Sequence, residues 1–477
     1  MSMKGEKRDM TALFQKLGDD RSSLIPISLC RPNMWDNIET SFSPMQRRFA
    51  AARNFKGDAG QRVRLPDETG EIAHVLFGVG AANKDDIGPI RVGQLSAFLP
   101  KDDYYIAHAP DDWPLRLIAT GWGMGAYKFD AYLKETADFP ILHFDMSANP
   151  REVSSIIDAL HFGRDLINIP AGDMGPVALH QAVTDLAAEF DAEITETIGD
   201  ALLDENLPMI HAVGRAAHEE PRLIEFEWGE ADHPRLALVG KGITFDTGGL
   251  NIKSANSARL MKKDMGGAAH ALALAKMIMA NNLPIRLHVL ISIAENAISA
   301  GAYRPGDVLS SRAGLTVEID NTDAEGRLVL GDALTKAAEY DPALMINFAT
   351  LTGAARVALG PQLAPFYCNR ENPVAEVLQK AKDECDPIWH MPLWRPYKPM
   401  LNSPIADMKN AGGGMAGSVT AGLFLQNFVK DKPWMHFDVY GWAPTTTPGH
   451  PKGGEIFATR ALYSWLKAGG LGTDLTH

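Results

Sequence analysis

The second half of the chain alternates between two hydrophobic patterns. Short apolar runs that suit strands, such as RLALVGKGITF and IRLHVLISIA, are separated by runs that suit helices, such as AAHALALAKMIMA. Buried strands alternating with helices are typical of a parallel sheet covered on both faces. The alternation continues through LTVEI, GDALTKAAEY, ALMINFATL, AGLFLQNFV and WMHFDVYG. This half predicts a large α/β domain with a mostly parallel central sheet flanked by helices.

The first 147 residues have a weaker pattern. Apolar runs such as HVLFGVGA and PILHFDM lie between turn-rich segments, which predicts a smaller α/β domain. The segment NPREVSSIIDALHFGRDLIN begins at Asn149 with an Asn-Pro pair and has helical spacing, so it is predicted to join the two halves. A length of 477 residues suits two to three folding units. We place the boundary near residue 148, between an accessory domain (1–147) and a catalytic domain (148–477).

Composition and charge narrow the function classes. The formal net charge of -13 disfavours a nucleic-acid partner, because such proteins generally need a concentrated basic face. Cys30, Cys368 and Cys385 lie far apart without metal or redox spacing, so we expect reduced thiols. The start, MSMKGEKRDMTALFQKL, lacks the apolar core of a secretory signal, and no segment has the apolar length of a membrane span. We therefore expect a cytoplasmic protein that does not enter a membrane.

Ionisable residues gather in three loops. Since ligands of open α/β sheets bind beyond the carboxyl ends of strands, the loops after strands should carry the chemistry. The segment KGITFDTGGLNIK follows one predicted strand, DNTDAEGR follows another, and MKKDMGG opens a predicted helix. Together these loops supply Lys241, Asp246, Lys253, Asp264, Asp323, Glu325 and Arg327.

Four carboxylates in one place require compensating cations. Packed together they would repel one another, and burial would raise their pKa values. Two divalent ions would cancel the four charges, and oxygen-rich ligation suits Mn²⁺, Mg²⁺ or Zn²⁺. Such a centre can polarise a carbonyl and generate hydroxide, which indicates hydrolysis. Each acid alone would more often be a turn or cap residue; their joint occurrence favours a site.

Four segments resemble the M17 leucyl aminopeptidase family: VGKGITFDTGGLNIK, MKKDMGGAA, NTDAEGRLVLGDAL and FATLTGA. The resemblance covers roughly residues 150–440, while the N-terminal third is similar only in size and place. It implies a cytoplasmic metalloaminopeptidase that removes N-terminal residues from peptides and assembles as a homohexamer.

The resemblance also implies residue roles. Two ions per subunit, Mn²⁺ or Zn²⁺, would be bound by Lys241, Asp246, Asp264, Asp323 and Glu325, with Asp246 and Glu325 reaching both. Lys241 can ligate only as a neutral amine, which adjacent dications would favour. Lys253 would polarise the scissile carbonyl, and Arg327 would hold a bicarbonate that shuttles a proton from the metal-bridging water. Met265, Thr350 and Gly353 would line the pocket for the first side chain.

The C-terminal part departs from the family. Tyr440 stands where the family usually has a small residue, and Trp442 adds a second ring. If Tyr440 lines the pocket, leucine should not be the best substrate, and a smaller or more polar residue should be preferred. Packing of both rings against a neighbouring subunit or the loop 412–417 is an equal alternative. The native metal and the preferred residue stay open.

Two other functional classes use parts of the same pattern. A dimetal phosphoesterase could employ the acidic cluster, but it would usually need histidines and more basic groups. A DNA-binding role of the N-terminal domain would need a basic surface, which the net acidity disfavours. GGGMAG (412–417) formally satisfies GxGxxG, but LNSPIADMKNA before it is not predicted as a strand. No HExxH occurs, and His270 is interpreted as a satisfied core residue.

Overall fold

The computed structural model describes residues 10–82, 87–145, 149–472 and 475. The chain forms two compact units, one comprising Met1–His161 with Thr445–Lys452, the other Phe162–Pro444 with Gly453–His477. The predicted connecting helix is confirmed as α5 (Pro150–Asn168). Residue 148, where we predict the boundary, lies outside the described residues, so that boundary stays a prediction.

The first unit is built on a six-stranded sheet of order β1-β6-β5-β2-β4-β3. All neighbouring strands are parallel except β3, which pairs antiparallel with β4. This confirms the α/β prediction for the N-terminal part. The strands are β1 (Phe14–Lys16), β2 (Ile25–Cys30), β3 (Arg62–Pro66), β4 (Ile72–Gly78), β5 (Asp103–His108) and β6 (Ile141–Phe144). The helices are η1 (Met10–Leu13), α1 (Pro32–Ile38), η2 (Glu39–Ser41), α2 (Pro44–Ala52), η4 (Gly88–Val92), α3 (Gly93–Ser96) and α4 (Leu115–Gly125).

The second unit contains an eight-stranded sheet of order β15-β14-β17-β13-β9-β10-β8-β7. Its four central strands, β17, β13, β9 and β10, are parallel, and β14, β8 and β7 add antiparallel pairings at the sides. The strands are β7 (Glu193–Ile198), β8 (Arg222–Trp228), β9 (Arg235–Asp246), β10 (Arg286–Asn296), β13 (Leu344–Ala349), β14 (Ala364–Cys368), β15 (Ile388–His390) and β17 (Trp434–Asp438). The central strands are nearly continuously buried, as expected when helices cover both faces.

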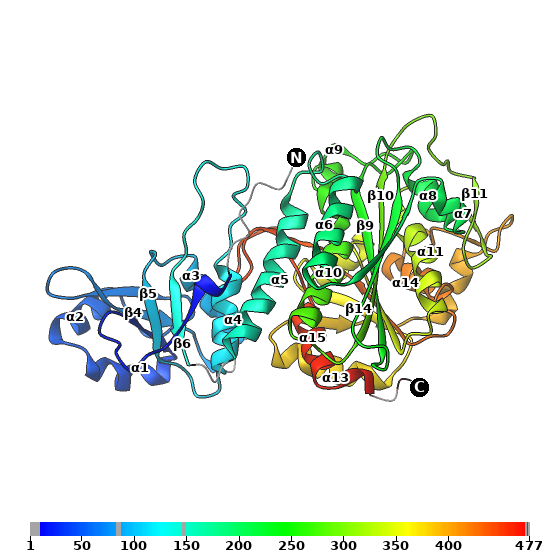
Figure 1. Cartoon of the computed structure of the whole chain (residues 1–477). Coiled ribbons are helices and arrows are strands. Elements are labelled where there is room, and N and C mark those ends of the chain that lie inside the picture. Colours follow the sequence, from blue (N-terminus) through cyan, green and yellow to red (C-terminus); the bar gives the residue numbers. More distant parts are fainter. Residues whose placement is uncertain (1–9, 83–86, 146–148, 473–474, 476–477) are drawn as a thin grey trace. The chain divides into compact units, whose positions relative to one another are not determined.

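Two helical layers cover this sheet (Figure 1). Helices α6, α10 and α15 lie on one face, and α8, α11 and α14 lie on the other. The helices of this unit are α6 (Pro176–Glu189), α7 (Ala201–Asp204), α8 (Pro208–Gly214), α9 (Ala255–Ala258), η6 (Met261–Met265), α10 (Gly266–Ala280), α11 (Gly326–Glu339), α12 (Gly353–Leu359), α13 (Asn372–Asp383), η7 (Arg395–Leu401), α14 (Gly417–Gln426), α15 (Thr459–Lys467) and η8 (Gly470–Gly472).

Helix α10 lies unusually close to the sheet at its N-terminus. A Cβ at Gly267 would lie 2.3 Å from the carbonyl oxygen of Phe348 in β13, so only glycine allows this approach. Every residue of α10 up to Met279 is buried. His270 is confirmed as a satisfied core residue: its Nδ1 lies 2.6 Å from the Gly266 oxygen, and its Nε2 accepts from the Phe457 nitrogen. The close contact fixes the turn just before α10 against the strand ends.

Two small sheets complete this unit and correct the sequence interpretation. The predicted strand LTVEI is confirmed as β12 (Thr316–Glu318), but it lies outside the main sheet, antiparallel to β11 (Val308–Ser310) and parallel to β16 (Met408–Lys409). The segment LNSPIADMKNA therefore contains a short strand that we did not predict. The second small sheet pairs β18 (Trp442–Ala443) with β19 (Gly453–Gly454).

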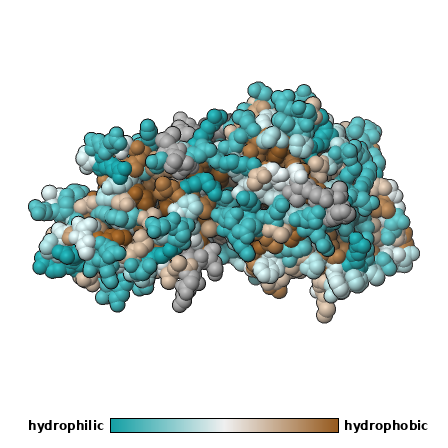
Figure 2. Space-filling view, turned by 90° about the horizontal axis from the view of Figure 1, so that it is seen from below, coloured by the Kyte–Doolittle hydropathy of each residue, from teal (hydrophilic) through white to brown (hydrophobic). Residues whose placement is uncertain are grey.

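The surface in view in Figure 2 is mostly hydrophilic, with hydrophobic residues in small groups. Within the described segments, no helix combines the length and apolar character that a membrane crossing requires.

A buried ion pair anchors the C-terminal part of α5 within the second unit. Arg164 and Glu455 are both fully buried, and the guanidinium donates from Nε and Nη2 to the two carboxylate oxygens at 3.0 Å. The bidentate geometry makes this a strong ion pair. Because both groups are shielded from water, each charge is stabilised largely by the other.

We predict that Arg164→Met destabilises the second unit by about 3–5 kcal/mol, because it leaves the Glu455 charge buried without its partner. Urea unfolding followed by tryptophan fluorescence measures the change. The exposed pair Lys430–Glu339 is the control, since Lys430→Met should cost less than about 1 kcal/mol. The double variant Arg164→Met, Glu455→Met should recover part of the loss. Equal effects of the buried and exposed substitutions would contradict this prediction.

Candidate metal centre and active site

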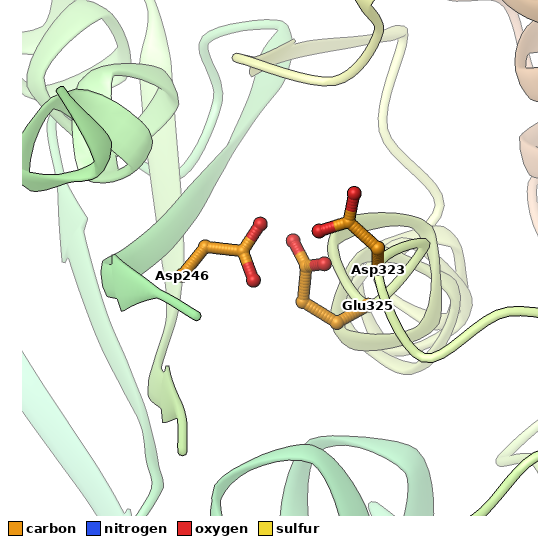
Figure 3. Close-up of side chains that lie close together, drawn as sticks. All are labelled: Asp246, Asp323 and Glu325. Carbon is orange, nitrogen blue, oxygen red and sulfur yellow. The ribbon is translucent and has the colours of Figure 1, made fainter. Parts of the chain in front are cut away.

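Three carboxylates meet at the end of the central strand β9. Asp246 is the last residue of that strand, while Asp323 and Glu325 lie in the loop between β12 and α11. One oxygen of each lies within 4.8 Å of the others. Figure 3 shows the three carboxylates pointing toward one another, Asp246 from the strand end and Glu325 from the start of the helix. The structure thus brings together three of the four predicted acidic ligands around one point.

The fourth predicted acid, Asp264, reaches the group through Lys241. The Lys241 ammonium lies 2.8 Å from Asp264 Oδ2 and 2.9 Å from Glu325 Oε1. Asp264 lies in η6 and not directly after a strand, so the acids come from two strand ends and a helix entrance. The close packing of α10 against the sheet carries Asp264 to the same place as the other acids.

Two glycine-dependent contacts fix Lys241 and Asp246. A Cβ at Gly326, the first residue of α11, would lie 2.5–2.7 Å from the end of the Lys241 side chain. The start of this helix therefore needs glycine to make room for the lysine. Gly248, at a φ of +88°, turns the backbone so that its N–H donates to Asp246 Oδ1 at 2.8 Å.

The second lysine pairs with the other side of the cluster. Lys253 Nζ lies 2.8 Å from Asp246 Oδ2 and also contacts the Asp323 carboxylate. Four carboxylates therefore share two ammonium groups, a net charge of about -2 when all are ionised. Both lysines were predicted in this centre, and the structure places both there.

The excess of negative charge shifts the pKa values of the clustered residues. Burial and the Asp246 charge raise the pKa of Glu325 to about 8, and the same causes raise that of Asp323 to about 6. Burial opposes the charged form of Lys241, but Asp264, Glu325 and Asp246 outweigh it and raise the lysine pKa. Glu325 Oε2 is buried and has no hydrogen-bond partner in the described part of the chain. The cluster thus holds an acceptor and a negative charge that its own residues do not satisfy.

Arg327 is the second residue of α11 and follows Glu325 by two positions. Its Nη1 donates to the Asn410 oxygen at 2.7 Å, whereas its buried Nε has no partner in the segments that the structure describes. Burial lowers the pKa of Arg327 to about 10, although Glu325 and Asp438 favour its charged form. The guanidinium therefore stays cationic at neutral pH and keeps a free donor.

The predicted pocket residues have different environments. Thr350 Oγ1 lies 2.8 Å from Asp264 Oδ1, so this residue adjoins the acidic centre. Gly353 is exposed at the start of α12. Met265 is fully buried, whereas Met261, at the other end of η6, is partly exposed. The role in the pocket stays a prediction for all three, and Met261 is the methionine of this turn that has accessible surface.

The sequence interpretation did not include Asn296, the last residue of β10. Its Nδ2 lies 2.8 Å from Asp246 Oδ1 and 3.0 Å from the Thr322 oxygen, and the residue is fully buried. It therefore orients the central carboxylate and ties β10 to the loop that carries Asp323. The polar pair Glu295-Asn296 directly after the apolar run IRLHVLISIA is the signal that could have identified it.

Sequence comparisons agree with this geometry. Residues 161–463 match the catalytic domain of the cytosol aminopeptidase family, M17, and residues 25–144 match the N-terminal domain of M17 aminopeptidases. The N-terminal third therefore matches the N-terminal domain of this family, whereas the sequence analysis found a similarity only in size and position. A "Probable cytosol aminopeptidase" of Syntrophotalea carbinolica is 35% identical over 82% of this chain and 85% of its own length. One of Geotalea uraniireducens is 32% identical over 92% and 94%.

Solved structures share the same fold. A cytosol aminopeptidase from Coxiella burnetii is 41% identical, with a TM-score of 0.90 over 96% of this chain and 99% of its own. The bottromycin maturation enzyme BotP in complex with Mn is 29% identical, with a TM-score of 0.85 over 94% and 99%. With both domains matched and the acidic centre in place, the chain belongs to the cytosol aminopeptidase family, M17, and is a metal-dependent aminopeptidase.

Proposed function

We propose that this aminopeptidase uses two divalent ions held at the end of β9. The observation that carries this is the unpaired, buried Glu325 Oε2 within a group of three converging carboxylates. The remaining ligands would be Lys241 and Asp264, the latter also held by Thr350. Mn²⁺ or Zn²⁺ suits this donor set, and the Mn complex of the relative BotP supports the choice of a divalent ion.

The residues fit such a pair of ions. The net charge of the cluster is negative, so cations would relieve the repulsion that now raises the pKa values of Glu325 and Asp323. Lys241 is placed to offer its nitrogen once adjacent cations lower its pKa. When bound, such ions supply Lewis-acid polarisation of a peptide carbonyl and a hydroxide at neutral pH.

We assign the other charged residues to the peptide. Lys253 Nζ contacts both Asp246 and Asp323 and its side chain is partly exposed, so that it can donate to the scissile carbonyl and stabilise the oxyanion that develops. The free Nε–H of Arg327 and its planar guanidinium suit a bicarbonate, which would take a proton from the attacking water and pass it to the leaving amine.

The assembly and location follow from the family. We infer a homohexamer acting on peptides in the cytoplasm, supported by the resemblance and by the name that the relatives carry. We propose no nucleic-acid partner, since the net charge is -13.

Removal of metal should abolish hydrolysis of aminoacyl amides, and Mn²⁺ or Zn²⁺ should restore it, because the carboxylates otherwise lack compensating charge. The measurement is kcat/KM after chelation and after titration with each ion, with metal content determined by mass spectrometry. Two ions per subunit at full activity are expected. Undiminished activity in protein free of metal would refute the proposal.

Lys253→Ala should lower kcat by about 100-fold or more while metal content is retained, because the loss falls on the developing oxyanion. Metal content and kcat are measured on the same preparation. Lys432→Ala, a substitution in a surface ion pair, is the matched control and should leave both values unchanged. An unaltered kcat in Lys253→Ala would mean that this lysine only neutralises Asp246 and Asp323.

Arg327→Ala should also retain its metals and lower kcat, because it removes an anion clamp and not a ligand. The bicarbonate dependence of kcat is the decisive measurement: added bicarbonate should stimulate the wild type and have little effect on the variant. Arg304→Ala, at an exposed position, is the control. Equal stimulation of variant and wild type would assign bicarbonate binding elsewhere.

A further inference from the structure

Two basic side chains, Lys263 and Arg356, flank the ring of Tyr440 near the candidate metal centre, and burial lowers the pKa of Lys263 to about 7. Lys263 Nζ lies 5.1 Å from the ring centroid, and the guanidinium carbon of Arg356 lies 4.7 Å from it. Lys263 is only 2% exposed, whereas Arg356 and Tyr440 are half-buried. An aromatic ring attracts each cation, but it offers no acceptor that could replace a carboxylate.

This cluster adjoins the residues predicted to hold the first side chain of a peptide. Lys263 directly precedes Asp264 in η6. A Cβ at Gly353 would meet only Arg356, with Nη2 at 3.7 Å. A Cβ at Gly441, next to Tyr440, would lie 3.3 Å from Thr350 Cγ2. Arg356 thus lies beside Gly353, Tyr440 precedes a residue that lies beside Thr350, and Lys263 is linked to both through the Tyr440 ring.

Neither basic group forms a close ion pair in the described part of the chain, although the charge of the neighbouring Asp264 favours the charged form of Lys263. Among the described residues, no carboxylate oxygen lies within 4.0 Å of Lys263 Nζ or of the Arg356 guanidinium; Arg356 Nη1 donates only to the Thr352 oxygen. The nearby Asp438 is already satisfied. Its carboxylate accepts from the Leu351 and Thr352 nitrogens and from the hydroxyls of Thr352 and Ser418.

A cavity with room for about one water molecule lies next to the guanidinium, and Lys263 is not among the residues that line it. Arg356, Tyr440 and Asp438 line one small cavity together with apolar residues such as Leu363 and Phe457. Arginine presents a planar fork that matches a carboxylate, and a tyrosine ring can cover the methylene groups of a short side chain. The cluster thus has the donors, the positive charge and the apolar wall that an acidic side chain requires.

We propose that Lys263, Arg356 and Tyr440 form a subsite for the carboxylate of an acidic first residue, so that the enzyme prefers peptides beginning with glutamate or aspartate. This inference rests on the proposed aminopeptidase function and specifies its substrate class. It also gives Tyr440 a definite role, since the ring fills the end of a leucine pocket and positions the two donors.

The test compares substrates that differ in charge but hardly in shape. With the metal-loaded enzyme, kcat/KM is measured for the amides of Glu, Gln, Asp, Asn, Leu and Arg. We expect a Glu-to-Gln ratio of about ten or more, because a charge-assisted bidentate contact is lost with the neutral side chain. Calorimetric binding of free L-glutamate and L-glutamine should show the same order without any turnover.

Substitutions at two residues, Arg356 and Lys263, locate the effect. Arg356→Gln should reduce the Glu-to-Gln ratio to about one, and Arg356→Glu should shift the preference toward argininamide, because the charge of the subsite is reversed. Lys263→Met should lower the ratio with metal content checked, since Asp264 is its neighbour. Arg304→Gln, at an exposed arginine outside the cluster, should preserve the wild-type ratio.

The outcomes separate this inference from the proposed function. If leucinamide is cleaved and the wild-type Glu-to-Gln ratio is one or less, the subsite is wrong while the aminopeptidase function stands. A high ratio that survives in Arg356→Gln also overturns the subsite. If no amide is cleaved by the metal-loaded enzyme, the proposed function fails and the inference falls with it.

Discussion

The need to keep four carboxylates together in a buried place governs the catalytic unit. Asp246, Asp264, Asp323 and Glu325 would repel one another in a medium of low dielectric constant, and two lysines only partly compensate them. The surrounding fold has to supply donors, space and rigid positions for this cluster. The parallel strand β9 provides the rigid position of Asp246, while the loop after β12 and the turn η6 bring the other three acids to its end.

Close packing of helices onto the sheet sets the distances. Gly267 lets α10 approach β13, which carries Asp264 toward Lys241, and Gly326 leaves room for Lys241 at the start of α11. Asn296 then fixes Asp246 from the neighbouring strand. The precision of the site therefore comes from main-chain contacts and buried hydrogen bonds within the second unit, while the ionisable groups themselves contribute charge.

The sequence was sufficient for the parts that depend on local pattern. The alternation of apolar runs predicted β9, α10, β10, α11, β13, α14 and β17, and the three charged loops predicted the acids and lysines that the structure brings together. The sequence was insufficient where the structure depends on which distant segments pair with each other. The strand LTVEI has the composition of a central strand, yet it pairs with β11 and β16, because hydrophobicity does not specify a partner. Likewise, the burial of Met265 and the positions of Lys263 and Arg356 around Tyr440 depend on contacts between segments nearly a hundred residues or more apart.

The first unit contains two stretches of the chain that lie far apart in the sequence. Its segment Thr445–Lys452 returns to the N-terminal residues, and a Cβ at Gly93 would lie 2.7 Å from the Gly449 backbone. On the ribosome this unit emerges first but lacks that segment until nearly the whole catalytic unit has been made. At about 5–20 residues per second the delay is roughly 15–60 s. The N-terminal unit therefore stays incomplete until a segment that is synthesised after all four clustered carboxylates has emerged, so its final packing can only follow translation of the acidic centre.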